Sequence, residues 1–223
     1  MSISISKTTH EVLRNFLSIN KSITIQAGSV ISTLSVNKNI MARYECEEVF
    51  TRDLPIYDLS DFCNAIRLCQ SPELDLSNEN YFLLRDPVTK GKFKIFYSDP
   101  DLIVTANGKE IKLNNPEVVF TLKSSNLKML QIASQAQSID DLCIYGNDGV
   151  MSICVTDKKN DTSNVYSIEM GPTDDEFCHC FKMENLRLMS DYDYEVSIYD
   201  GRVALFETNK LKYWIALEPQ ASK

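Results

Sequence analysis

The sequence predicts an α+β protein in which one domain plan occurs twice, each copy with two helices and several antiparallel strands. Two stretches share a local plan: 53–68 (DLPIYDLSDFCNAIRL) and 179–189 (HCFKMENLRLM) each combine an aromatic-bearing run, a polar cap and a short amphipathic helix. Segments around them match as well, for example FLSINKSITIQAGSVIST with IASQAQSIDDLCIYGNDGVMSI. The offset is about 115 to 125 residues, which is far too long for a solenoid repeat. This spacing indicates a duplicated domain.

Four short helices are predicted, at 8–20, 59–68, 125–135 and 184–189, because apolar residues recur there at helical spacing. The apolar side of the first helix consists of Val12, Leu13, Phe16 and Leu17, and that of the second of Leu59, Phe62, Cys63 and Ile66. The third helix has Met129, Leu130, Ile132 and Ala133 on its apolar side, and the fourth has Met183, Leu186 and Met189.

Strands are predicted where short apolar or alternating runs lie between turn residues. In the first half they are 22–26, 30–36, 40–47, 73–76, 81–85 and 92–97, and in the second half 120–123, 142–145, 150–156, 165–170, 194–199, 203–207 and 212–217. The run 98–116 is bounded by prolines and has no helical period, so we interpret it as a connector with short strands of its own. The alternative is an ordinary hairpin within one domain. The predicted domains are 1–98 and 117–223, joined by a connector at 99–116.

Composition limits the classes of protein that remain. The 223 residues are 43% hydrophobic and 24% charged, which suits a packed core. No apolar run is long enough to span a membrane, and no secretory signal is readable at the N-terminus. The seven cysteines are scattered, several on predicted apolar faces, and we interpret them as reduced thiols of a cytosolic protein. The net charge of −8 argues against a protein that holds nucleic acid by neutralising phosphates.

Motifs of catalysis are few. The sequence has no phosphate-binding loop, no HExxH and no GxSxG. The cluster Cys178-His179-Cys180 lacks a second ligand pair, so we expect no metal site, and His10 is the one other histidine. We therefore expect no enzyme and no cofactor. One alternative is a small-molecule enzyme that uses the carboxylates of Asp191 and Asp193.

Two stretches resemble a known family. KTTHEVLRNFLSIN (7–20), DLPIYDLSDFCNAIRL (53–68) and the two-copy layout resemble the sliding clamps of T-even-type bacteriophages, the processivity factors of phage DNA polymerase. The resemblance implies duplicated DNA-clamp domains in a homotrimeric ring, with antiparallel sheets outside and helices lining a channel. It also implies three partners: duplex DNA bound without sequence specificity, the C-terminal peptide of the DNA polymerase, and a clamp loader. Neither a membrane nor a cofactor is implied, and the location would be the cytoplasm of the infected bacterial host.

The acidic composition is compatible with such a ring. A closed ring stays on DNA by topology, so it needs few contacts to phosphates, and a basic lining is sufficient. The candidate DNA-facing residues lie on the polar sides of the four predicted helices: Lys7, Arg14, Lys21, Arg67, Lys128 and Arg187. The alternative is that these basic side chains are only solvated.

The resemblance also gives candidate contact surfaces. For the subunit interface we expect 92–97 of one subunit to meet 165–170 of the next, through Lys92, Ile95, Tyr97, Val165, Ile168 and Met170. For the pocket that receives the polymerase peptide we expect the apolar residues of the connector and of the C-terminal end: Leu102, Ile103, Ile111, Leu113, Leu217 and Pro219. The alternative is that these side chains seal the domain junction. Another alternative for the whole chain is a viral structural ring protein without DNA binding.

Overall fold

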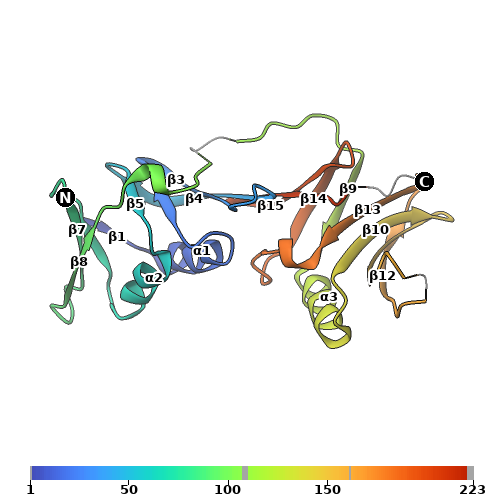
Figure 1. Ribbon diagram of the computed structural model, residues 1–223, viewed down its shortest axis with the longest axis horizontal. Coiled ribbons are helices and arrows are strands. Elements are labelled where there is room, and N and C mark those ends of the chain that lie inside the picture. Colours follow the sequence, from blue (N-terminus) through green and yellow to red (C-terminus); the bar gives the residue numbers. More distant parts are fainter. Residues whose placement is uncertain (1, 107–109, 161, 220–223) are drawn as a thin grey trace. The chain divides into compact units, whose positions relative to one another are not determined.

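The computed structural model describes residues 2–106, 110–160 and 162–219, and the chain divides into two compact units. The N-terminal unit comprises Met1–Ile111 with Lys210–Lys212, and the C-terminal unit comprises Lys112–Asn209 with Tyr213–Lys223. Each unit combines antiparallel sheets with helical segments (Figure 1), so the predicted α+β class is confirmed.

The N-terminal unit contains two helices beside three groups of strands. A four-stranded sheet has the order β1-β6-β7-β8, β2 pairs with β5, and β3 pairs with β4, all antiparallel. Helices α1 and α2 pack against each other (Figure 1). The elements are β1 (Ser2–Ser4), α1 (Lys7–Leu17), β2 (Ile23–Ile25), β3 (Gly28–Leu34), β4 (Ile40–Phe50), β5 (Leu54–Ile56), α2 (Leu59–Arg67), β6 (Glu73–Asp75), β7 (Tyr81–Arg85), β8 (Lys92–Phe96) and a 3₁₀ turn at Pro100–Leu102.

Among the described residues of the C-terminal unit, the one α-helix is α3, which packs against β11 and β12. One antiparallel sheet of this unit has the order β12-β11-β10-β13. In a second sheet, β16, β15, β14 and β9 are neighbours in that order. The elements are β9 (Val118–Leu122), α3 (Ser124–Gln137), β10 (Asp141–Asn147), β11 (Val150–Thr156), β12 (Tyr166–Pro172), β13 (Phe177–Lys182), a 3₁₀ turn at Met183–Asn185, β14 (Tyr194–Tyr199), β15 (Val203–Thr208) and β16 (Leu211–Ala216).

The prediction of a helix at 184–189 is wrong. The segment begins with a short 3₁₀ turn at Met183–Asn185 in place of an α-helix, and Leu186 already has non-helical dihedral angles. Leu186 and Leu188 are both buried, so this segment inserts every second side chain into the core instead of every third or fourth. Within the described residues, the expected two helices per domain are therefore present in the N-terminal unit only.

The predicted orientation of α3 is also wrong in part. Its buried side consists of Leu127, Leu130 and Ser134, whereas Met129 and Ile132 are 48% and 58% exposed. Apolar residues lie on both sides of this helix, so their spacing alone did not fix which side faces the core. The apolar sides predicted for α1 and α2 are buried, with Leu17 only half-buried.

The connector and the cysteines differ from expectation as well. Between 99 and 116 the described residues form one 3₁₀ turn and no strand. Cys143 and Cys180 form a disulfide, because the register of β10 and β13 places them directly opposite each other with their Cα atoms 4.1 Å apart. The prediction that all cysteines are reduced is wrong for this pair.

Helix α1 starts at a buried carboxylate that the sequence did not reveal. Ser6 caps the helix by accepting a hydrogen bond from the Thr9 backbone N–H, and Glu48 on β4 accepts from both the Ser6 backbone N–H and the Thr9 hydroxyl, each at 2.7 Å. Glu48 is 7% exposed. Burial opposes ionisation of Glu48, but the hydrogen bonds from Ser6 and Thr9 outweigh it and lower its pKa.

We expect Glu48→Gln to lower the free energy of unfolding by about 1–3 kcal/mol at pH 7, because it removes a buried ionised acceptor. The folded-state pKa of Glu48 is depressed, so its stabilising contribution is present above the unfolded pKa of about 4.3 and is lost as the pH falls through the folded pKa. Urea unfolding of both proteins between pH 7 and pH 3 should show the difference shrinking. Glu79→Gln, at an exposed site between β6 and β7, is the control and should change little.

Candidate nucleic-acid and partner interfaces

Four of the six candidate DNA-facing residues lie in the N-terminal unit, and all four are exposed: Lys7, Arg14, Lys21 and Arg67. Lys7 lies 3.8 Å from the Glu11 carboxylate one turn further along α1. Arg14 and Arg67 occupy the last turns of α1 and α2.

His10 joins the two helices that carry these arginines. Its Nε2 lies 3.0 Å from the carbonyl oxygen of Cys63. Burial lowers the pKa of His10, and the charges of Arg14 and Arg67 act in the same direction. Both arginines therefore lie close enough to His10 to act on its charge, and this histidine favours its neutral form.

The two candidates of the C-terminal unit have local partners. Lys128 on α3 forms an ion pair of 2.6 Å with Asp191, and the Arg187 side chain donates to the Glu184 backbone carbonyl. Asp193 accepts a hydrogen bond from the Ser124 backbone N–H at the start of α3. These contacts give Asp191 and Asp193 structural roles. They also weaken the case for Lys128 as a phosphate contact, because its charge is compensated.

The two strands predicted to form the subunit interface both lie at sheet edges. Within the described residues, β8 pairs only with β7, and β12 pairs only with β11. Lys92 and Ile95 lie on β8, and Ile168 and Met170 on β12. Val165 precedes β12 and is 56% exposed. Both edges therefore present backbone groups that a further strand could pair with.

Tyr97 is placed differently from the other interface candidates. Its ring packs against Phe82 at 5.5 Å between centroids, and the Arg52 guanidinium lies 4.8 Å from the ring centre. Tyr97 therefore supports the interior side of the sheet that contains β8.

Exposed apolar side chains occur in the same units as the β8 and β12 edges. The spacing of residues in the sequence did not identify these side chains as exposed. Between α2 and β8 lies a pocket of about 580 Å³ whose lining includes Phe62, Ala65 and Ile95. Tyr57, Leu68, Phe93 and Phe96 line the same pocket and are between 38% and 67% exposed. In the C-terminal unit the counterparts are Met129 and Ile132 on α3, together with Val165. Such contiguous exposed apolar groups are typical of protein contact sites.

The residues predicted for the peptide pocket are divided between the units. Leu102, Ile103 and Ile111 belong to the N-terminal unit, where Leu102 and Ile111 are exposed and Ile103 is buried. Leu113, Leu217 and Pro219 belong to the C-terminal unit.

Leu217 and Pro219 line a pocket of about 610 Å³. Its other lining residues are Glu117, His179, Asp200, Gly201 and Arg202. The pocket therefore combines two of the predicted apolar residues with a polar side that was not predicted from the sequence.

The polar side of this pocket is built around His179. Its Nε2 lies 3.7 Å from the Glu117 carboxylate, and its Nδ1 has no hydrogen-bond partner among the described residues. Burial lowers the pKa of His179, although the carboxylate of Glu117 opposes that shift. Alternation along β13 could have indicated its inward direction, because His179 shares a face with the buried Phe181.

Nothing in the described ranges is arranged as a cluster of three or more His, Cys, Asp or Glu side chains that could hold a metal ion. The helices of the same ranges are all too short or too polar to cross a membrane.

Comparison with known proteins decides the family. The chain is 32% identical to the sliding clamp of Vibrio phage KVP40, over 96% of this chain and 98% of that protein. The chain belongs to the family of bacteriophage sliding clamps. It is 28% identical to the sliding clamp of Enterobacteria phage T4 over 98% of both chains. Family models match residues 4–81 as a DNA polymerase processivity factor and residues 119–219 as the C-terminal part of the gp45 sliding clamp. The resemblance drawn from 7–20 and 53–68 is confirmed.

Solved structures support the clamp fold. The proliferating cell nuclear antigen of Entamoeba histolytica is similar with a TM-score of 0.74 and 13% identity, over 97% of this chain and 98% of that one. The β clamp of H. pylori is similar with a TM-score of 0.68 and 14% identity, over 99% of this chain and 64% of that one. The clamp fold that the resemblance implies is confirmed.

Proposed function

We propose that this sliding clamp is a homotrimeric ring that encircles duplex DNA and tethers the phage DNA polymerase during replication. The observation that carries the proposal is the end-to-end match to phage sliding clamps, which covers both units of the chain. Family membership implies DNA and a DNA polymerase as partners. The trimer, the clamp loader and the location in the cytoplasm of the infected host are the further parts of the proposal.

The two sheet edges support closure into a ring. Each copy has one β8 edge in its N-terminal unit and one β12 edge in its C-terminal unit, so copies can join head to tail. The charges are complementary, because Lys92 and Lys94 are exposed on β8 and Glu169 is exposed on β12. The proposed interface comprises Lys92, Ile95, Tyr97, Val165, Ile168 and Met170, to which the exposed apolar side chains Tyr57, Leu68, Phe93, Phe96, Met129 and Ile132 are added.

The proposed contacts to DNA run to the phosphate backbone. Arg14 and Arg67 are the strongest candidates because both are exposed in the last turns of the packed helices α1 and α2, and both charges act on His10. Lys7, Lys21, Lys128 and Arg187 are weaker candidates because they are paired locally or lie apart. Contacts of this kind position a duplex without reading its sequence. We assign the two clamp domains to 1–98 and 117–223, with the connector at 99–116, and the family models at 4–81 and 119–219 support this division.

The proposed site for the polymerase peptide contains Leu217 and Pro219, with Leu102, Ile103, Ile111 and Leu113 as further candidates. A pocket with an apolar wall and a few polar groups is typical of peptide-anchor sites. We expect Leu217→Ser, in the lining of the pocket, and Ile111→Ser, at an exposed apolar candidate outside that lining, each to weaken binding of the polymerase C-terminal peptide by about tenfold or more, as is common when an apolar contact is removed. Fluorescence anisotropy with a labelled peptide measures this.

Leu217 is 8% exposed, so unfolding temperature and oligomeric mass must be checked in parallel. Val36→Ser, at a residue 73% exposed in the turn after β3, should bind the peptide normally. Unchanged affinity in both Leu217→Ser and Ile111→Ser would place the peptide elsewhere.

The function as a whole is tested by polymerase products on primed circular DNA. With loader and ATP present, the chain should lengthen the products, and its mass in solution should be that of three copies. A ring that leaves product length unchanged would favour the alternative of a structural ring protein without DNA binding. The enzyme alternative has lost its main support, since Asp191 pairs with Lys128 and Asp193 accepts from Ser124.

A further inference from the structure

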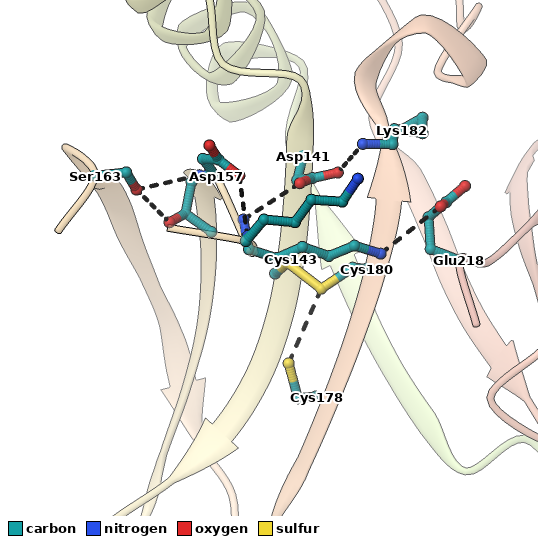
Figure 2. Close-up of a disulfide and its surroundings, with 11 residues drawn as sticks. Asp141, Cys143, Asp157, Ser163, Cys178, Cys180, Lys182 and Glu218 are labelled. Carbon is teal, nitrogen blue, oxygen red and sulfur yellow. Dashed lines mark hydrogen bonds and ion pairs between the residues drawn. A yellow bond between two sulfur atoms is a disulfide. The ribbon is translucent and has the colours of Figure 1, made fainter. Parts of the chain in front are cut away.

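Four cysteines gather on one sheet of the C-terminal unit. Cys143 on β10 is bonded to Cys180 on β13, and Cys154 on β11 stands opposite Cys143 on its other side. Cys178 lies two residues before Cys180, and its Sγ is 4.0 Å from the Cys180 Sγ. Figure 2 shows Cys178 beside the disulfide, with Asp141, Lys182 and Glu218 around it.

The four cysteine residues differ in their exposure to solvent. Cys143 and Cys154 are each 4% exposed, and Cys180 is half-buried. Cys178 is exposed, although it lies outside the bond. A thiol in solution therefore reaches Cys178 more readily than it reaches Cys143 or Cys180. Because thiol–disulfide exchange requires direct attack on a sulfur atom, reduction is expected to proceed through the accessible Cys178.

We propose that Cys178 is the relay through which a small-molecule thiol reduces the Cys143–Cys180 bond. The Cys178 thiolate, having given its proton to water, attacks the Cys180 sulfur. The Cys143–Cys180 bond breaks, and its electron pair leaves on the Cys143 sulfur, which takes up a proton. The disulfide is now Cys178–Cys180, with one sulfur at the surface.

Two small thiols complete the reduction. The first attacks the exposed Cys178 sulfur, so that Cys180 leaves as a thiol and a mixed disulfide remains on Cys178. The second attacks the small-molecule sulfur of that mixed disulfide and releases Cys178 as a thiol. In sum, two small thiols are oxidised to their disulfide, and the protein disulfide gains two electrons and two protons.

The intermediate bond is a transient one. Residues two apart on an antiparallel strand have Cα atoms about 6.8 Å apart, at the upper end of the separations of roughly 4.4–6.8 Å that disulfides span. The Cys143–Cys180 pair, at 4.1 Å, lies just below the lower end of that range. Neither pairing therefore has the common separation, and exchange runs in both directions until a thiol in solution intercepts the Cys178–Cys180 form.

The charges around the site make the exchange dependent on pH. Although Cys178 is an exposed residue, surrounding protein atoms partly desolvate its thiol and raise its pKa, and the positive charge of Lys158 opposes part of that shift. The thiolate is the attacking species, so transfer to Cys178 speeds up as the pH rises toward its pKa. The charged groups around the cysteines are largely paired: Lys182 forms an ion pair with Asp141 and Lys158 with Glu218, while the Asp157 carboxylate accepts a hydrogen bond from the Lys159 backbone N–H.

The test is the rate at which reduced glutathione opens the Cys143–Cys180 bond. Samples are quenched with acid, unfolded and alkylated, and the cysteine-containing peptides are quantified by mass spectrometry. We expect Cys178→Ser to lower the rate constant by about tenfold or more, because the internal nucleophile is removed. In the unmodified chain the rate should level off as glutathione rises, since the internal transfer becomes limiting. In Cys178→Ser it should stay proportional to glutathione.

Cys154→Ser is the matched control, because Cys154 also neighbours the bond but is buried. It should be reduced at the rate of the unmodified chain. Cys178→Ala provides a second variant in case serine disturbs the fold. Equal rates in the unmodified chain and in the Cys178 variants would overturn the proposal. So would alkylation of Cys143 and Cys180 before any reductant is added.

Discussion

Replacing Phe96 by Glu is expected to convert the proposed trimer into monomers at micromolar concentration. Phe96 is 63% exposed at the end of the edge strand β8 and lines the apolar pocket between α2 and β8. A carboxylate there would have to lose its hydration in an apolar contact. The ring dissociation constant should rise by about 30-fold or more, equivalent to the roughly 2 kcal/mol that central apolar contacts commonly contribute. Sedimentation velocity over a concentration series measures it.

Val88→Glu provides the same change of charge outside the proposed interface. Val88 is 61% exposed in the turn between β7 and β8, so its replacement should leave the trimer intact. On the other side of the interface, Ile132→Glu on α3 should also dissociate the ring. A trimer that persists in both Phe96→Glu and Ile132→Glu would mean that these apolar surfaces serve another contact.

Replacing Arg14 and Arg67 together by Glu is expected to abolish most of the gain in processivity while the trimer remains. In a ring of three copies the change turns six basic groups acidic. If all six bind phosphates, the slope of log affinity against log salt should become shallower by up to about 5, because each neutralised phosphate contributes about 0.9 to that slope. Polymerase assays on two primed circular templates of unrelated sequence, over a range of salt, measure the effect.

Two matched variants sharpen this test. Lys90→Glu with Lys159→Glu makes the same charge change at exposed turns away from α1 and α2, and it should leave processivity near normal. Lys128→Glu with Arg187→Glu should have a smaller effect than the arginine pair, because Lys128 is already paired with Asp191. Normal processivity in the Arg14 and Arg67 variant would show that α1 and α2 do not face DNA, and a defect on only one template would contradict contact through the backbone alone.

Most strands could be predicted from the sequence because their signals are local. Tyr81–Arg85, Val150–Thr156 and Tyr194–Tyr199 have the predicted bounds, since each is an alternating run closed by turn residues. The segment after β13 could not be predicted in the same way. Its apolar residues fit a helical period, but packing buries Leu186 and Leu188 instead. The sequence allows both a helical period and burial of alternate residues in this segment, and tertiary packing selects the second.

The candidate site was harder to predict than the fold. Charge on the polar face of a helix is visible in the sequence, so Arg14 and Arg67 could be named. Partners far away in the chain are not visible, and for that reason the pairing of Lys128 with Asp191 and the disulfide of Cys143 with Cys180 were missed. The exposed Phe93 and Phe96 look like ordinary strand residues until the sheet order shows that β8 is an edge.

The disulfide closes a loop that contains the whole of β11 and β12. Its two cysteines are 37 residues apart, and a cross-link of that length removes loop entropy from the unfolded chain equivalent to about 4 kcal/mol in the chain-entropy model. The strand β12, which presents the proposed subunit edge, lies inside this loop. Oxidation therefore favours folding of the segment on which the proposed ring closure depends. A reduced chain would fold its C-terminal unit against a greater entropic cost.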